Sequence, residues 1–143
     1  MLALFADIHS NLEALRACLQ HARSRGATRH VFLGDLVGYG ADPKAVVELV
    51  RSSAAAGARV VQGNHDAAVA GSAAGLTEGA RDTVLWTREL LSKEEIAWLG
   101  SLPLCVREEQ TCFVHASAAS PERWEYVEHP PAAKRSADAA DSC

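Results

Sequence analysis

Four short apolar runs in this chain each end in polar residues that can bind a metal ion. The runs are rich in β-branched and aromatic residues, which is typical of strands buried in a covered parallel sheet. Ligands of open α/β sheets gather at the carboxyl ends of such strands, so we expect the four endings to converge in space. The runs and their endings are 2–6 with Asp7-Ile8-His9, 31–33 with Gly34-Asp35, 60–62 with Gly63-Asn64-His65-Asp66, and 112–114 with His115.

Two segments with helical patterns separate the first three runs. In the first segment, Ser10 and Glu13 have the spacing of a capping box, and leucines recur on one face until Gly26. The second segment begins with Asp42 at the N-cap and Pro43 at the first helical position. The apolar faces consist of Leu12, Leu15 and Leu19 in the first segment and of Val46, Val47 and Val50 in the second. The chain therefore begins with a predicted βαβαβ unit with right-handed crossovers.

The pattern after Asp66 is less regular. Residues 67–75 are small and contain glycine, which predicts a loop over the site. One helix is expected over 77–91, and a second helix is expected to begin at a capping box over 92–95. A hairpin with strands over 104–107 and 111–114 and a further short strand over 124–127 are also expected. Residues 130–143 lack apolar periodicity, so we predict one domain over 1–129 followed by a disordered tail over 130–143.

Composition restricts the class of protein. The 143 residues suffice for one domain with a real core. The net charge of −4, without a cluster of Lys or Arg, argues against a nucleic-acid partner. The longest apolar stretch is too short for a membrane span, and no signal peptide is recognisable. We therefore expect a cytoplasmic protein that has no membrane partner and whose four cysteines are reduced thiols.

The ordered set Asp7-x-His9, Gly34-Asp35, Gly63-Asn64-His65-Asp66 and Val114-His115 resembles the calcineurin-like metallophosphoesterase superfamily. The resemblance extends from Met1 to about Val127, and residues 36–43 are similar to the small prokaryotic phosphodiesterase-type members. It implies an α/β fold, the calcineurin-like α/β/β/α sandwich, with a parallel βαβαβ start and a second sheet that is partly missing.

The resemblance also implies roles for individual residues. Asp7 and His9 would bind one divalent ion, Asn64 and His115 a second, and the Asp35 carboxylate would bridge the two. The ions would be Mn, Fe, Zn, Ni or Co, because the set of carboxylates, imidazoles and one amide oxygen suits hard or borderline cations.

The expected reaction is hydrolysis of a small phosphoester, most simply a phosphodiester, by a hydroxide that bridges the two ions. His65 would act beside the ions as an acid or transition-state stabiliser and not as a ligand, and Asp66 is a candidate for holding its ring. Tyr39, between two glycines, either stacks on a substrate base or covers its own loop.

Two departures from the family pattern leave an alternative open. The family's late Gly-His-x-His element is absent from the sequence. Either the chain is a truncated or frameshifted form, or it keeps three protein ligands per ion and completes the site with water or a partner chain. Residues 38–40, Gly-Tyr-Gly, stand where protein-phosphatase and dinucleoside-tetraphosphatase relatives have an Asp or Arg. This departure argues against both of those assignments and favours a diester substrate. The alternative is a truncated, catalytically impaired protein of the same fold that binds metal or a partner. An uncovered sheet edge would also favour self-association as a homo-oligomer.

Overall fold

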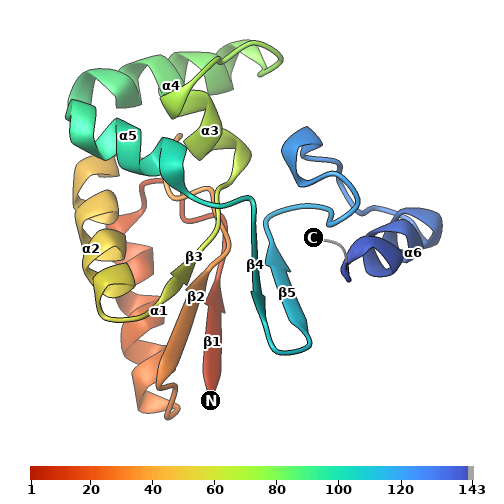
Figure 1. Ribbon diagram of the computed structural model, residues 1–143. Coiled ribbons are helices and arrows are strands. Elements are labelled where there is room, and N and C mark those ends of the chain that lie inside the picture. Colours follow the sequence, from red (N-terminus) through yellow and green to blue (C-terminus); the bar gives the residue numbers. More distant parts are fainter. Residues whose placement is uncertain (142–143) are drawn as a thin grey trace.

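The computed structural model describes residues 1–141 of the chain, and it contains the expected parallel βαβαβ unit (Figure 1). The strands pair in the order β1-β2-β3, with Leu2 opposite Arg29 and Val31 opposite Arg59. The elements are β1 (Leu2–Phe5), α1 (Leu12–Ser24), β2 (Arg29–Phe32), α2 (Pro43–Ala55) and β3 (Arg59–Val60). The apolar residues predicted for the two helices are all buried, and α1 and α2 cover one face of the sheet.

The predicted capping box at the start of α1 is wrong. Asn11 is the N-cap, and its side chain accepts a hydrogen bond from the Ala14 N–H at 3.0 Å. Ser10 has left-handed backbone, with φ of 57°, and its N–H donates to the Leu36 carbonyl at 2.9 Å. Because this loop is tied to the end of the neighbouring strand, the helix begins after Ser10 and not at it.

Residues 64–70 form a helix, α3 (Asn64–Ala70), where the sequence predicted a loop from residue 67. The reason is local: the Asp66 carboxylate accepts a hydrogen bond from the Gly63 N–H, and the Ala67 N–H donates to the Gly63 carbonyl. The Gly-Asn-His-Asp sequence is therefore the first turn of a helix. It is followed by α4 (Glu78–Leu90) and α5 (Lys93–Ser101), and α5 has the predicted capping box of Ser92 and Glu95.

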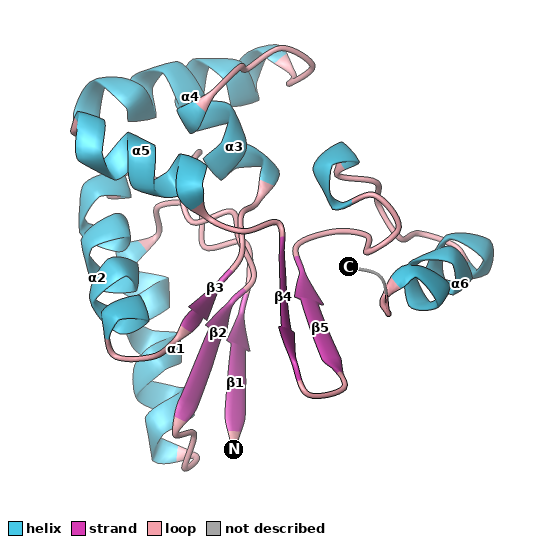
Figure 2. Cartoon of the chain, in the orientation of Figure 1, coloured by secondary structure: helices cyan, strands magenta, loops and turns pink. Residues whose placement is uncertain are grey.

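The predicted hairpin is present as β4 (Cys105–Glu108) and β5 (Thr111–Val114), which pair antiparallel. Phe113 packs with Val31 and Val61 in a small cluster separate from the main core. The hairpin therefore lies on the face of the parallel sheet opposite α1 and α2, as Figure 2 shows. The resulting layers are helices, parallel sheet and hairpin, which is the expected α/β/β order.

Two predictions for the last part of the chain are wrong. Residues 124–127 form no strand, because Trp124 ends a short 3-10 helix, η1 (Pro121–Arg123), in the left-handed conformation with φ of 55°. Part of the predicted disordered tail is helical, as α6 (Pro130–Ala139), where prolines occupy the first helical positions and the His129 side chain caps the Ala132 N–H. Residues 142 and 143 lie outside the described part of the chain.

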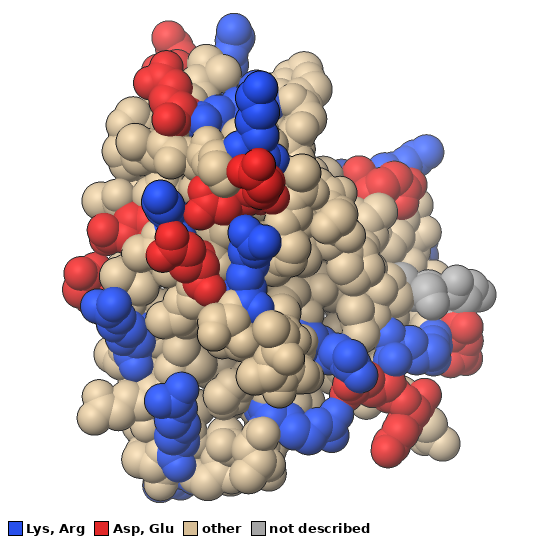
Figure 3. All heavy atoms as spheres, turned by 60° about the vertical axis from the view of Figure 1, so that its left-hand side comes forward, with Lys and Arg blue, Asp and Glu red and all other residues tan. Residues whose placement is uncertain are grey.

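Two properties of the surface bear on the partners expected from composition. On the face shown in Figure 3, acidic and basic side chains are interspersed. Within residues 1–141, no helix is both long and apolar enough to span a bilayer.

Glu108 joins the hairpin to the parallel sheet. Its carboxylate accepts a hydrogen bond from Arg59 Nε at 2.7 Å and also pairs with Arg29. These arginines hold the pKa of Glu108 below its usual range, chiefly through the Arg59 hydrogen bond. Because the pKa of Glu108 is lower in the folded chain than in the unfolded chain, its contacts with Arg29 and Arg59 stabilise the fold at pH values above the normal pKa of glutamate. This stabilisation is lost as the pH falls through the folded-state pKa of Glu108.

We expect Glu108→Gln to lower the midpoint of thermal unfolding by about 1–4 °C at low salt, with a smaller effect at high salt because the pairs are exposed. The difference from the unmodified chain should vanish at acidic pH. Calorimetry at two salt concentrations tests this. The matched control is Glu109→Gln, an exposed neighbour in the hairpin turn. Equal midpoints for Glu108→Gln and the unmodified chain at low salt and neutral pH would contradict the prediction.

Candidate metal centre

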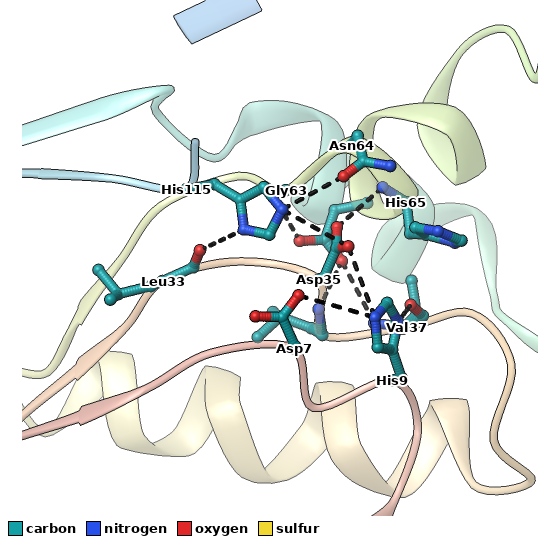
Figure 4. Close-up of polar contacts among 11 residues, drawn as sticks. Asp7, His9, Leu33, Asp35, Val37, Gly63, Asn64, His65 and His115 are labelled. Atoms are coloured by element: carbon teal, nitrogen blue, oxygen red, sulfur yellow. Dashed lines mark hydrogen bonds and ion pairs between the residues drawn. The ribbon is translucent and has the colours of Figure 1, made fainter. Parts of the chain in front are cut away.

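The four strand endings converge at one edge of the parallel sheet, with Asp35 at the centre (Figure 4). Asp35 Oδ2 lies 3.6 Å from His9 Nε2 and 3.5 Å from His115 Nε2. Asp7 Oδ1 is 3.8 Å from His9 Nε2, and Asn64 Oδ1 is 3.2 Å from His115 Nε2. All five predicted ligands are therefore brought together by loops that follow β1, β2, β3 and β5.

Backbone carbonyls orient the two imidazoles. His9 Nδ1 is 3.2 Å from the Val37 carbonyl oxygen, and His115 Nδ1 is 2.7 Å from that of Leu33. A carbonyl can only accept, so each Nδ1 carries the proton and each Nε2 is directed at the carboxylates. Metal-binding histidines are held in this way by a hydrogen bond from the ring nitrogen that does not bind the metal.

The acceptors around His115 Nε2 fit a cation. In the neutral ring Nε2 is an acceptor, yet it faces two further acceptors, Asp35 Oδ2 and Asn64 Oδ1. Three converging acceptors need a proton or a positive ion between them. The pKa values agree: burial opposes charge on both groups, but the hydrogen bond and attraction between them raise the pKa of His115 to about 9 and hold that of Asp35 below its usual range.

Among residues 1–141, two sets of three side chains have ligand atoms within 4.8 Å of one another, and Asp35 belongs to both. One set is Asp35 with Asp7 and His115, and the other is Asp35 with His9 and His65. The first set joins Asp7 to His115, whereas the resemblance implies that Asp7 shares an ion with His9. The second set includes His65, which the sequence interpretation placed beside the ions and not among their ligands.

The backbone of the site is held in an uncommon conformation. Asp7, His9, Asp35 and Tyr39 have positive φ values between 46° and 61°. Such strain in non-glycine residues persists where surrounding contacts enforce it, and it clusters at functional sites. Gly63 is required for a different reason: a Cβ at this position would collide with Asp35 Oδ1.

The His65 side chain is buried beside the carboxylates, and the backbone N–H of His65 donates a hydrogen bond to Asp35 Oδ1 at 2.9 Å. Its ring lies 4.7 Å from that of Tyr39 and 5.0 Å from that of His9, between ring centroids. Nδ1 is buried beside Gly38, whose added Cβ would approach it to 2.5 Å, and it has no partner among the described residues. Burial, as the main cause, lowers the pKa of His65 and favours the neutral ring.

Asp66 does not hold the His65 ring, contrary to the sequence interpretation. Its carboxylate is fully buried and accepts hydrogen bonds from the N–H groups of Leu36, Val37 and Gly63 at 2.9, 3.3 and 3.0 Å. Burial raises its pKa to about 7, although these donors favour the charged form. The side chain therefore joins the Asp35 loop to the first turn of α3.

Two connected cavities open at the site. One, of about 380 Å³, is lined by the candidate ligands, and the other, of about 680 Å³, extends toward the α3–α4 connection. Tyr39, Asn64, His65, Trp124 and Tyr126 line both.

The sequence interpretation missed Trp124 and Tyr126 as residues of the site. The Trp124 ring lies 6.0 Å from that of His115 between centroids, in an edge-to-face arrangement. The hydrophobic pattern offered no signal for this, because Trp124 is positioned by its left-handed turn.

Comparisons with known proteins agree with this geometry. The chain is 41% identical over 133 residues to an uncharacterized protein from Methanocaldococcus jannaschii, covering 89% of this chain and 54% of that protein. It is 33% identical over 128 residues to a symmetrical bis(5'-nucleosyl)-tetraphosphatase from Methylococcus capsulatus, covering 86% of this chain and 45% of that enzyme.

A crystal structure of a metallophosphoesterase from Sphaerobacter thermophilus matches with a TM-score of 0.81 and 36% identity, covering 96% of this chain and 55% of that one. The chain thus spans about half the length of the relatives it matches. The family model for calcineurin-like phosphoesterases matches residues 1–136. The chain belongs to the calcineurin-like phosphoesterase family.

Proposed function

We propose that this protein is a metal-dependent phosphoesterase that acts on phosphodiesters at a site for two divalent ions. The observation that carries the proposal is the position of Asp35 Oδ2. This single oxygen faces His9 Nε2 at 3.6 Å and His115 Nε2 at 3.5 Å, from opposite sides of the site. One carboxylate oxygen between two oriented imidazoles is suited to be shared by two cations.

Asp7 and His9 would hold one ion, and Asn64 and His115 would hold the other. The Asp35 carboxylate would bind both ions. Two such ions, when bound, supply positive charge that activates water and stabilises the attacking and leaving oxygens at phosphorus. Mn, Fe, Zn, Ni and Co all accept this mixture of carboxylate, imidazole and amide ligands.

The protein's own contribution is to orient these groups and to assist the leaving group. His65 lies beside the carboxylates with Nδ1 buried, so Nε2 is the ring nitrogen that a substrate can reach. From there the neutral ring can donate a hydrogen bond to the departing oxygen, and the charged ring can transfer its proton to it.

The lining of the smaller cavity supports a diester substrate. Among the described residues that line it, there is no lysine or arginine. A phosphate monoester carries an additional negative charge, and sites for monoesters commonly supply an arginine fork for it. A diester has one charge and needs no such group beyond the metal ions.

The proposal is tested by measuring metal content and turnover on the same preparation. The chain is loaded with Mn²⁺ or Zn²⁺, its metal content is determined by elemental analysis, and hydrolysis of bis(p-nitrophenyl) phosphate is followed. We expect two ions per chain and metal-dependent turnover. Two bound ions without turnover would favour the catalytically impaired metal-binding protein of the same fold. No bound metal would refute both metal-binding proposals and leave the partner-binding protein.

His65→Asn should lower turnover by about a hundredfold for esters with poor leaving groups, the usual size of general acid catalysis, and have less effect for good ones. Metal content should not change if His65 is not a ligand. Kinetics on esters of graded leaving-group acidity, with elemental analysis, provide the test. The control is His21→Asn, an exposed histidine on α1. Loss of a metal ion in His65→Asn would assign His65 to the ligand set that also contains His9 and Asp35.

A further inference from the structure

The larger cavity continues the candidate metal centre on the side of Asn64 and His65. Its volume is about 680 Å³, and it shares five lining residues with the cavity that holds the ligands. His65 is the residue that assists the departing oxygen in the proposed function. A substrate whose phosphoryl group lies at the ligands therefore has its departing ester arm directed into this larger cavity.

Three aromatic residues, Tyr39, Trp124 and Tyr126, line this cavity. Trp124 packs edge-to-face on His115, and Tyr39 packs against His65. Tyr126 is 79% exposed and Tyr39 is 54% exposed. Exposing aromatic rings to water is unfavourable, and rings that gather around one cavity are typical of sites that bind another flat, apolar group.

Most of the remaining lining residues are small residues of α3, α4 and their connection, both apolar ones such as Ala67 and Ala80 and the polar Ser72 and Thr77. Arg123 of η1 also lines the cavity. Arg88 fixes the α3–α4 segment. Its guanidinium donates to the carbonyl oxygens of Val69, at 2.8 Å, and of Ala68 and Gly71 at the end of α3. The cavity is thus lined by three aromatic rings and by small residues of a segment that Arg88 holds in place, a lining that suits a flat ring.

We propose that the cavity between Trp124, Tyr126 and the α3–α4 connection binds a flat aromatic ring on the departing arm of the phosphoester. Aryl esters and nucleoside esters both present such a ring. The inference depends on the proposed phosphoesterase function for its orientation, because the phosphoryl group must lie at the ligands. Trp124 and Tyr126 then determine which esters are accepted.

Binding is tested first, without turnover. Phenylphosphonate and methylphosphonate, whose C–P bonds do not hydrolyse, are titrated calorimetrically into the Mn²⁺-loaded chain, and AMP is compared with ribose 5-phosphate. We expect the ring-bearing member of at least one pair to bind about tenfold more tightly, as stacking on aromatic side chains provides. A preference in the first pair alone indicates aryl esters, and a preference in the second indicates nucleosides. Equal affinities within both pairs overturn the inference.

Variants assign the effect to the cavity. Trp124→Leu and Tyr126→Ala should each remove most of the preference, while the affinity for methylphosphonate is retained. The matched control is Trp86→Leu, since Trp86 is an exposed tryptophan on α4 that lines neither cavity. An unchanged preference in both Trp124→Leu and Tyr126→Ala refutes the assignment.

Kinetics then separate this inference from the proposed function. Methyl phenyl phosphate is compared with a methyl diester whose departing group is a fluorinated alkyl alcohol of matched acidity, so that only the ring differs. We expect about tenfold higher kcat/KM for the aryl ester, arising mainly in KM and lost in Trp124→Leu. Hydrolysis of both diesters at equal rates refutes the ring site and leaves the phosphoesterase. Tight phenylphosphonate binding without hydrolysis of either diester refutes the phosphodiesterase and leaves the ring site.

Discussion

Asp35→Asn should abolish metal-dependent hydrolysis more completely than a change at any other candidate ligand. Asp35 Oδ2 is the atom that lies between His9 and His115, and Asp35 belongs to both sets of side chains that can hold an ion. Its replacement removes one negative charge from both ion positions at once. We expect a loss on the order of a thousandfold in kcat and weaker binding of both ions.

This substitution is suited to the test because it retains the shape of the side chain. Asparagine can still accept the hydrogen bond that the His65 N–H donates to Asp35 Oδ1 at 2.9 Å, so the first turn of α3 is preserved. Thermal unfolding and circular dichroism verify that the variant folds. Elemental analysis and hydrolysis of bis(p-nitrophenyl) phosphate then measure the effect.

Asp7→Asn provides the comparison. Asp7 lies at the exposed side of the site, and in the proposed arrangement it holds one ion together with His9. Its replacement should therefore weaken one ion and lower activity less than Asp35→Asn. If Asp35→Asn retains two ions and full activity, the shared-oxygen arrangement is not the basis of catalysis. If Asp7→Asn has the larger effect, the ions are not shared in the way proposed.

The strand-end residues show what could be predicted from sequence. Asp7, Asp35 and Asn64 follow strands whose last residues, Phe5, Phe32 and Val60, are buried. Parallel strands of one sheet end at the same edge, so the convergence of these side chains required no knowledge of distant contacts. The apolar faces of α1 and α2 were equally predictable, because the 3.6-residue period appears in the sequence itself.

The features that sequence did not indicate depend on backbone geometry and long-range contacts. Ser10 is not the N-cap of α1 because its backbone N–H donates a hydrogen bond to the carbonyl of Leu36, which is distant in the sequence. Trp124 reaches the site because its own backbone is left-handed, a conformation that the hydrophobic pattern of the sequence does not predict. For Asp66, the motif predicts an acid beside His65, the proposed catalytic histidine, and only the structure shows that the hydrogen bonds of this acid go to the backbone.

Asp66→Ala should have the largest effect on stability of any change at the site. The carboxylate is fully buried and accepts hydrogen bonds from three backbone N–H groups, those of Leu36, Val37 and Gly63. Alanine leaves these donors buried without partners, and each unsatisfied donor costs about 1–3 kcal/mol. With partial relaxation, we expect the free energy of unfolding to fall by about 3–5 kcal/mol, a large fraction of the stability of a domain of this size.

The free energy of unfolding of Asp66→Asn should lie between that of the unmodified chain and that of Asp66→Ala. The amide retains one oxygen, which can accept from either Gly63 or the Leu36–Val37 pair, and its NH₂ group faces the donors left over. We expect a loss of about 1–3 kcal/mol, because at least one buried donor then lacks a partner. Urea unfolding of the unmodified chain and both variants measures the order. Asp82→Ala, at an exposed position on α4, is the control and should change stability by less than about 0.5 kcal/mol.

The same variants decide between the two roles considered for Asp66. A residue that joins the Asp35 loop to α3 affects the relative position of Asp35 and Asn64, so its loss should weaken metal binding together with stability. A residue that acts on the reacting atoms through His65 should instead lower kcat and leave both stability and metal affinity intact. If Asp66→Ala unfolds at the same urea concentration as the unmodified chain and loses only kcat, the catalytic role is correct, and the three backbone hydrogen bonds do not hold the site together.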